Sequence, residues 1–169
     1  MDEKVTYFND LLVRLEEIFY HELSGMTHAK VEYVGTDYLK DKPIQGTTVE
    51  EVTENCIKEI KAGGLVEDIT FTRGGGGILL TLNVKNCLHL PMEAKLKSGQ
   101  KNEGGVAPYM CPIANMILDR ILNILKYEMV YNASLEKIDT DAGDCVLKCV
   151  VYESADKIGQ VGDWRGSNT

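Results

Sequence analysis

The sequence predicts an α+β domain in which a four-stranded antiparallel sheet packs against helices, in the order helices, hairpin, helix, hairpin. Apolar residues first repeat at three- and four-residue steps, then alternate in two neighbouring segments, and both patterns recur once before the C-terminus. The chain has 169 residues, a typical size for one domain, and neither a repeat nor a linker interrupts it. We therefore expect a single domain over residues 1–153 and a flexible tail over 154–169.

The first helix is predicted over residues 4–24, which carry one long apolar stripe. Gly25 closes this pattern, because glycine readily takes the left-handed conformation that ends helices. Residues 28–41 fit a helix only weakly, and Gly35 interrupts them.

A second clear helix is predicted over residues 48–61. Thr47 and Glu50 have the spacing of a capping box, in which the glutamate reaches back to the backbone amide of the threonine. Gly63 and Gly64 end this helix.

Alternating apolar residues in segments 65–72 and 78–84 predict a β-hairpin, with the four glycines 74–77 at its tip. The glycine run does not indicate a phosphate loop. It lacks the terminal Lys-Ser/Thr pair and leads into a strand, whereas a phosphate loop leads into a helix.

The second half repeats the helix-then-hairpin order. Residues 86–106 read as a long irregular loop, of which we expect 88–106 to be mobile because the side chains there bury little. A helix is predicted over 108–127, followed by strands over 129–138 and 145–153.

The charge balance limits the classes of partner. Eighteen Lys and Arg stand against 26 Asp and Glu, a net charge of -8, and no basic run is present. Phosphate backbones and anionic lipids attract cations, so we expect neither a nucleic-acid nor a membrane partner. The first residues do not resemble a signal peptide, and no apolar stretch reaches the roughly 20 residues that cross a bilayer, so we expect a cytoplasmic protein.

The cysteines carry the strongest chemical signal. Five are present, an odd number with no Cys-x-x-Cys pair, which disfavours both a disulfide framework and a zinc knuckle. Cys87 follows the predicted hairpin, Cys111 lies in the first predicted turn of the next helix, and Cys145 begins the last strand. These places can converge at one end of an antiparallel sheet, where His89 adds an imidazole. A shared metal or reactive-thiol site at Cys87, His89, Cys111 and Cys145 is one interpretation.

Core packing is the other interpretation, since free cysteine is among the most buried residue types. We apply it to Cys56 and Cys149, which lie on apolar faces. For Cys87, Cys111 and Cys145 both interpretations stay open.

Three short segments, in this order, resemble a known family. They are Asn86-Cys87 after the glycine-tipped hairpin, Pro108-Tyr109-Met110-Cys111-Pro112 at the start of the helix, and Gly143-Asp144-Cys145-Val146-Leu147 at the start of the last strand. The order resembles the 4-vinyl-reductase-like, or hydrocarbon-binding, domain, whose fold is similar to that of TRAPP tethering subunits. The resemblance covers roughly residues 5–153. It implies a dimer built largely from helices and a pocket for a small apolar molecule, with some members linked to tetrapyrrole synthesis or to regulators.

One departure from the family pattern concerns the cysteines. Family members usually carry a further cysteine ahead of the last glycine turn, where this chain has Asp139 and Asp141. The resemblance therefore implies at most a mixed site, with Cys87, Cys111 and Cys145 joined by His89 or a carboxylate.

Three functions remain open at this point. The favoured one is a dimeric sensor or carrier of a hydrocarbon- or tetrapyrrole-like ligand, with a pocket that we expect Leu82, Met110, Ile113 and Ile117 to line. The second is a metal or cofactor protein that holds zinc or a haem-like group at the cysteines. The third is a scaffold subunit without a ligand. No nucleophile elbow or His-Glu-x-x-His motif occurs, so we assign no catalytic residue and do not favour an enzyme.

A homodimer is also expected from the helices themselves. The stripe of the first predicted helix carries eight large apolar residues, and one small sheet has limited area to cover several such helices. Surplus apolar surface of this kind is commonly covered by a second copy across a two-fold axis.

Overall fold

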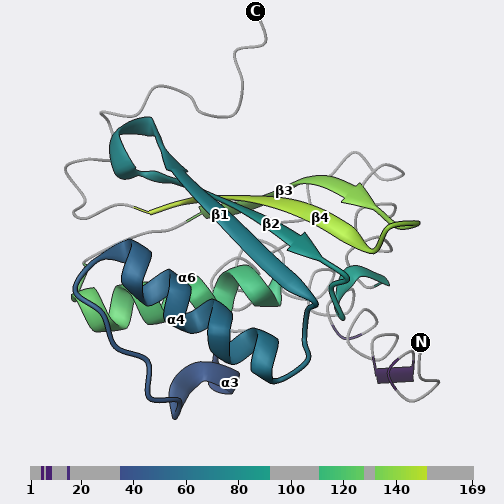
Figure 1. Cartoon of the computed structure of the whole chain (residues 1–169), viewed down its shortest axis with the longest axis horizontal. Coiled ribbons are helices and arrows are strands. Elements are labelled where there is room, and N and C mark those ends of the chain that lie inside the picture. The colour runs from purple at the N-terminus through teal and green to yellow at the C-terminus, as the bar shows by residue number, and fades with distance from the viewer. Residues whose placement is uncertain are drawn as a thin grey trace, which may run out of the picture.

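The chain folds as an α+β domain, as predicted (Figure 1). This computed structural model describes residues 35–91, 111–127 and 132–151, together with Val5, Tyr7, Phe8 and Leu15 near the N-terminus. Within this part, a helical region, a hairpin, a helix and a second hairpin follow one another. No helix among the described residues is both long enough and apolar enough to cross a bilayer.

The sheet consists of four antiparallel strands in the order β1-β2-β4-β3. Their bounds are β1 Asp68–Gly74, β2 Leu79–Lys85, β3 Asn132–Asp139 and β4 Asp144–Val150. The two hairpins thus lie side by side, because β2 of the first pairs with β4 of the second. A bulge in β3 places Glu136 between the pairs Leu135–Leu147 and Lys137–Val146.

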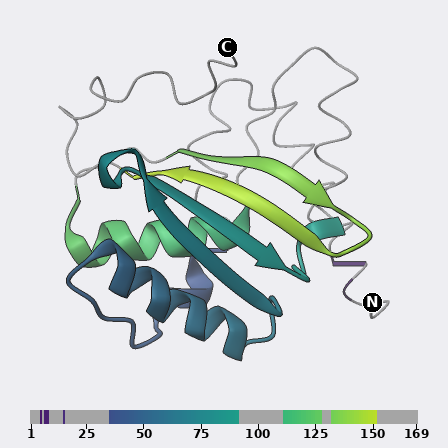
Figure 2. The ribbon, with the colours of Figure 1, turned by 45° about the horizontal axis from the view of Figure 1, so that its top comes forward.

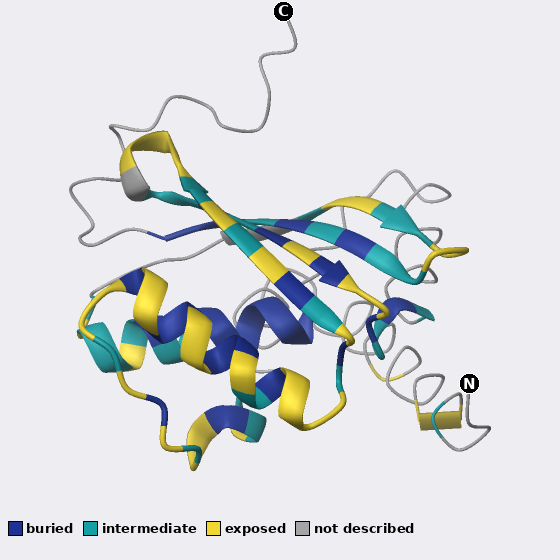
Figure 3. Ribbon diagram, viewed as in Figure 1, coloured by how far each residue is buried: buried dark blue, intermediate teal, exposed yellow. Residues whose placement is uncertain are grey.

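The helices that the structure describes between residues 35 and 127 lie on one side of this sheet (Figure 2). They are α3 (Asp37–Lys40), α4 (Val49–Ala62) and α6 (Pro112–Leu125). The first eight residues from Cys111 onward are buried, so the N-terminal half of α6 is the centre of the core (Figure 3). α4 exposes its charged side and buries an apolar stripe: Val49, Val52, Thr53, Cys56, Ile57 and Ile60.

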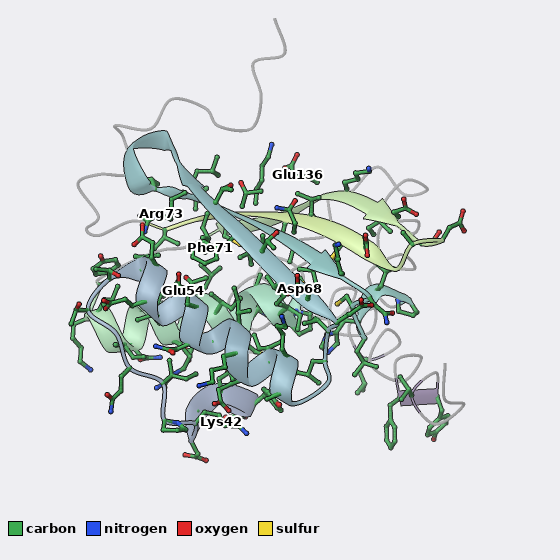
Figure 4. All side chains as sticks on the ribbon, in the orientation of Figure 1. Lys42, Glu54, Asp68, Phe71, Arg73 and Glu136 are labelled. Carbon is green, nitrogen blue, oxygen red and sulfur yellow. The ribbon has the colours of Figure 1, made fainter. Side chains whose placement is uncertain are left out.

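The strand alternation decides which side chains meet the helices. Every second residue of β2 and β4 is buried, namely Leu80, Leu82 and Val84 in β2 and Cys145, Leu147 and Cys149 in β4. The register aligns them into rows across the sheet, such as Phe71, Leu82, Leu147 and Leu135. Phe71 and Arg73 also lie on the side of β1 that faces α4, where Arg73 Nη1 is 3.2 Å from Glu50 Oε1 (Figure 4).

The capping prediction was wrong by one residue. Thr48, not Thr47, is the N-cap of α4, and its side chain accepts a hydrogen bond from the backbone N–H of Glu51. Glu51, not Glu50, reaches back and accepts from the backbone N–H of Thr47 at 2.7 Å. This bond, with the Thr47 hydroxyl, lowers the pKa of the Glu51 carboxyl. Two adjacent threonines before two adjacent glutamates fit the same motif in either register, so spacing alone did not decide between them.

Several predicted boundaries also shift. β1 begins at Asp68 rather than at residue 65, because Leu65 still donates its N–H to Ile60 at the end of α4. Within the weakly predicted helix over 28–41, the described residues form only α3. Gly35, just before this helix, has a φ of 87°. α6 begins at Pro112, so Cys111 is its N-cap and not part of its first turn.

Other predictions fall on residues outside the described part. These are the helix over 4–24, most of the loop over 88–106, the start of the predicted helix at 108–110, and the tail over 154–169. The dimer and the cytoplasmic location stay predictions as well.

The shifted cap gives a direct test of the α4 start. Replacing Thr48 by Ala removes the side-chain acceptor for a helix N–H and should lower the free energy of unfolding by about 1 kcal/mol. Replacing Thr47 by Ala removes only an exposed contact with Glu51 and should cost a few tenths of a kcal/mol. Urea denaturation measures both. A larger loss for Thr47→Ala than for Thr48→Ala would contradict the assignment.

Candidate functional site

Two turns meet at the end of the sheet where β2 finishes and β4 begins. Asn86, directly after β2, has a φ of 47°, and Gly143, directly before β4, has a φ of 74°. A Cβ atom on Gly143 would lie 3.3 Å from both the Cα and the Oδ1 of Asn86. Glycine is therefore required here for its left-handed backbone and for the space it leaves.

Backbone hydrogen bonds then fix Cys87 beside the start of β4. The N–H of Cys87 donates to the carbonyl of Gly143 at 3.1 Å, and the N–H of Asn86 donates to Oδ1 of Asp144 at 3.3 Å. The carbonyl of Cys87 accepts from the N–H of Leu90, which closes a tight turn that contains His89. Residues 86–90 are thus held by partners from the other hairpin and from their own turn.

Cys145 supplies the second thiol from the strand itself. It pairs with Val84 of β2 and Ile138 of β3, and its side chain lies on the helix-facing side of the sheet. Cys87 and Cys145 are 3% and 2% exposed. The side chains of Cys145 and His89 are the neighbours whose hydrogen bonding lowers the pKa of Cys87. We call Cys87, Cys145 and His89 the thiol site.

The thiol site stabilises a thiolate at Cys87. The hydrogen bond from Cys145 is the largest effect, and with the hydrogen bond and charge of His89 it lowers the pKa of Cys87 to about 5, although burial opposes the shift. Nδ1 of His89 is itself buried and has no hydrogen-bond partner in the described part of the chain. A thiolate is the form of cysteine that attacks electrophiles and binds metal ions.

Two other cysteines behave in the opposite way, as predicted for core residues. Burial raises the pKa of Cys56 in α4 to about 12, against a smaller lowering effect from Arg120. Burial alone raises the pKa of Cys149 in β4 to about 12. Both side chains are fully buried and remain protonated thiols at neutral pH.

The fourth predicted member of the site, Cys111, comes from the start of α6. Its position relative to Cys87 and Cys145 stays a prediction. Cys111 is buried at the N-cap of α6, and it is not among the groups that shift the pKa of Cys87. Within the ranges the structure describes, no three His, Cys, Asp or Glu side chains are arranged to hold a metal ion. The described residues therefore do not complete a zinc site, which requires four ligands in its closed form.

The predicted pocket residues belong to the core. Leu82, Ile113 and Ile117 are each fully buried, on the helix-facing side of β2 and on α6. Met110 lies outside the described residues. Whether these side chains contact a ligand stays a prediction.

Sequence reasoning did not recognise the residues that position the thiols. Asn86, Gly143 and Asp144 appeared only as parts of short motifs, whereas the structure gives them a geometric role. A usable signal was present, because Asn and Gly are the residue types that most readily adopt a positive φ. The hydrogen bond from Asn86 to Asp144 spans 58 positions of sequence and has no local signature.

The lowered pKa of Cys87 predicts a pH dependence of reactivity and stability. Between about pH 5 and the ordinary thiol pKa near 8.5, the unfolded chain binds a proton at Cys87 that the folded chain lacks. Stability relative to a Cys87→Ser variant should therefore rise with pH through this window, and should be lost as pH falls through 5. Urea denaturation across this range measures it. A difference that does not change with pH would contradict a stabilised thiolate.

A second prediction concerns the contact of the two turns. Gly143→Ala should be destabilising by about 2 kcal/mol or more, because it adds a crowded Cβ to a left-handed backbone. Gly64→Ala is the matched control: its φ is 72°, but nothing lies within 4 Å of the added Cβ. The control should cost only the left-handed strain, about 1 to 2 kcal/mol. Only Gly143→Ala should also raise the pKa of Cys87, which the pH profile of alkylation reports. Equal effects of both variants on that profile would contradict the positioning role.

Comparison with known proteins adds no assignment. No family model matches the sequence, and no curated protein matches it.

Proposed function

We propose that this chain is a small-molecule sensor or carrier domain whose ligand is engaged by the Cys87 thiolate, next to Cys145 and His89. The observation that carries the proposal is the buried, hydrogen-bonded thiol pair at the end of the sheet. Burial instead raises the pKa of Cys56 and Cys149, which favours the neutral form of both thiols.

Electrostatics supports a ligand at this position. Removing an anion from water is costly unless a partner compensates its charge. Cys87 is almost fully buried, and the described residues that lower its pKa supply hydrogen bonds and one imidazole, with no Lys or Arg among them. A ligand that accepts an electron pair from sulfur offsets this cost. Such thiophilic ligands comprise soft metal ions and organic molecules with an electrophilic carbon.

The surroundings favour a small and largely apolar ligand. Val84 and Ile138 flank Cys145 across the sheet, and Leu90 is buried in the turn that contains His89. The resemblance to the hydrocarbon-binding family supports the same class of ligand. A zinc ion remains within the proposal only if residues beyond the described part add ligands to Cys87 and Cys145.

The proposal is tested with two thiophilic probes on the full chain. Cd²⁺ tests metal-like binding through its thiolate charge-transfer absorbance, and N-ethylmaleimide tests reaction with an electrophilic carbon. Wild-type protein should react with N-ethylmaleimide first at Cys87, with a rate that rises through a midpoint near pH 5 and is then constant. Cys87→Ser should abolish the fast phase of alkylation and weaken Cd²⁺ binding at least about tenfold.

Cys149→Ala serves as the matched control, because it removes a buried thiol of the same sheet face that lies outside the thiol site. It should leave the alkylation rate at Cys87 and the binding of Cd²⁺ unchanged. Circular dichroism checks that each variant is folded. Fast alkylation that persists in Cys87→Ser, or Cd²⁺ binding lost equally in both variants, would overturn the proposal. Native mass spectrometry of the purified chain then identifies a bound ligand by its mass.

A further inference from the structure

We propose that Cys87 and Cys145 form a redox pair, which peroxide converts into an intramolecular disulfide bond that removes the Cys87 thiolate from its ligand. The formation of the disulfide is supported by the backbone contacts that bring the two residues to the same end of the sheet. Its consequence for the ligand rests on the proposed function.

The side chains of Cys87 and Cys145 are hydrogen-bonding neighbours, and a disulfide bond requires their sulfur atoms to reach about 2.05 Å. Two backbone contacts bring Cys87 and Cys145 to the same end of the sheet. The N–H of Cys87 donates to the carbonyl of Gly143, which lies two residues before Cys145. Cys145 in turn pairs across the strands with Val84, which lies three residues before Cys87. The linked residues are distant in sequence and belong to different hairpins, so the bond would join the two halves of the sheet.

The fold keeps the other sheet thiol away from this pair. Cys149 lies four residues further along β4, which corresponds to about 13 Å along a strand and exceeds the Cα separation of about 7 Å that a disulfide spans. A row of leucines, including Leu82 and Leu147, lies between the two positions. Cys149 and Cys56 are also held as thiols by burial. Cys87 and Cys145 are therefore the two cysteines that we assign to the redox pair.

The chemistry proceeds in two balanced steps. The Cys87 thiolate attacks one oxygen of hydrogen peroxide, the O–O bond breaks, and the released hydroxide takes a proton to form water, which leaves Cys87 as a sulfenic acid. The sulfur of Cys145 then attacks the sulfenic sulfur of Cys87. The S–S bond forms as a second water leaves with the Cys145 proton. Two electrons pass from the thiols to the peroxide in total, and a dithiol reductant reverses the change by thiol–disulfide exchange.

The test oxidises the full chain with hydrogen peroxide and then blocks the remaining thiols with N-ethylmaleimide. Intact mass should fall by two hydrogen atoms before blocking, three blocked cysteines should remain, and peptide mapping should link Cys87 to Cys145. Dithiothreitol should restore all five thiols. A linkage that involves Cys111, Cys56 or Cys149 instead, or no linkage while Cys87 is overoxidised, would overturn the redox pair.

Two variants test the role of Cys145 as the resolving thiol. Cys145→Ser removes the resolving thiol but keeps a hydrogen-bonding side chain, so oxidised Cys87 should persist as a sulfenic acid that dimedone traps. Cys149→Ser is the control and should still form the Cys87–Cys145 bond. No dimedone adduct at Cys87 in Cys145→Ser would contradict the proposed first step.

The effect of the disulfide on ligand binding is measured separately. Cd²⁺ titration of the oxidised wild type should show at least about a tenfold loss of affinity relative to the reduced form, because neither sulfur is then a thiolate. If the disulfide forms but Cd²⁺ binding is unchanged, the proposed function is overturned at this site and the redox pair stands. If Cd²⁺ binds the reduced pair but no disulfide forms, the redox pair is overturned and the proposed function stands.

Discussion

The close approach of Asn86 to Gly143 is the contact on which the thiol site depends. Both residues have left-handed backbones, and a side chain on Gly143 would meet the backbone of Asn86 at 3.3 Å. This contact brings the turn after β2 against the turn before β4, so that Cys87 donates its N–H to Gly143. The rest of the fold supports it: β2 and β4 pair directly in the centre of the sheet, and α6 covers the face toward which Cys145 points. The site is therefore a product of topology, since neither hairpin contains both thiols.

The cysteines of this domain show how surroundings, and not residue type, decide chemistry. Cys56, Cys149 and Cys87 are all buried, and burial acts on each by disfavouring the charged form. For Cys56 and Cys149 this effect is dominant and raises the thiol pKa to about 12. For Cys87 the hydrogen bonds from Cys145 and His89 outweigh it and lower the pKa to about 5. The polar neighbours Cys145 and His89 at the end of the sheet thus distinguish Cys87 from the two cysteines that stay neutral in the core.

Periodicity predicted the order of elements because a half-buried sheet and an amphipathic helix each impose a repeat on apolar residues. The alternation of Leu80, Leu82 and Val84 directly reports which side of β2 faces the helices. The exact first residue of a helix was harder to predict, since the adjacent pairs Thr47-Thr48 and Glu50-Glu51 fit a cap in two registers.

For the site, the positions of Cys87 and Cys145 at strand ends predicted their convergence, and the structure brings these two together with His89. Cys111 was predicted with them from its place at a helix start, and the structure places it at the N-cap of α6 as a buried residue. The contact of Asn86 with Gly143 joins two turns from separate hairpins, and no local pattern encodes it.

The most direct test of this account is a crystal structure of the reduced full chain at neutral pH. The account predicts that the sulfur atoms of Cys87 and Cys145 lie in hydrogen-bond contact, that the imidazole of His89 bonds to Cys87, and that Asn86 and Gly143 keep their left-handed backbones. Sulfur atoms separated by other side chains, or an Asn86 turn that leaves Cys87 exposed to solvent, would contradict it.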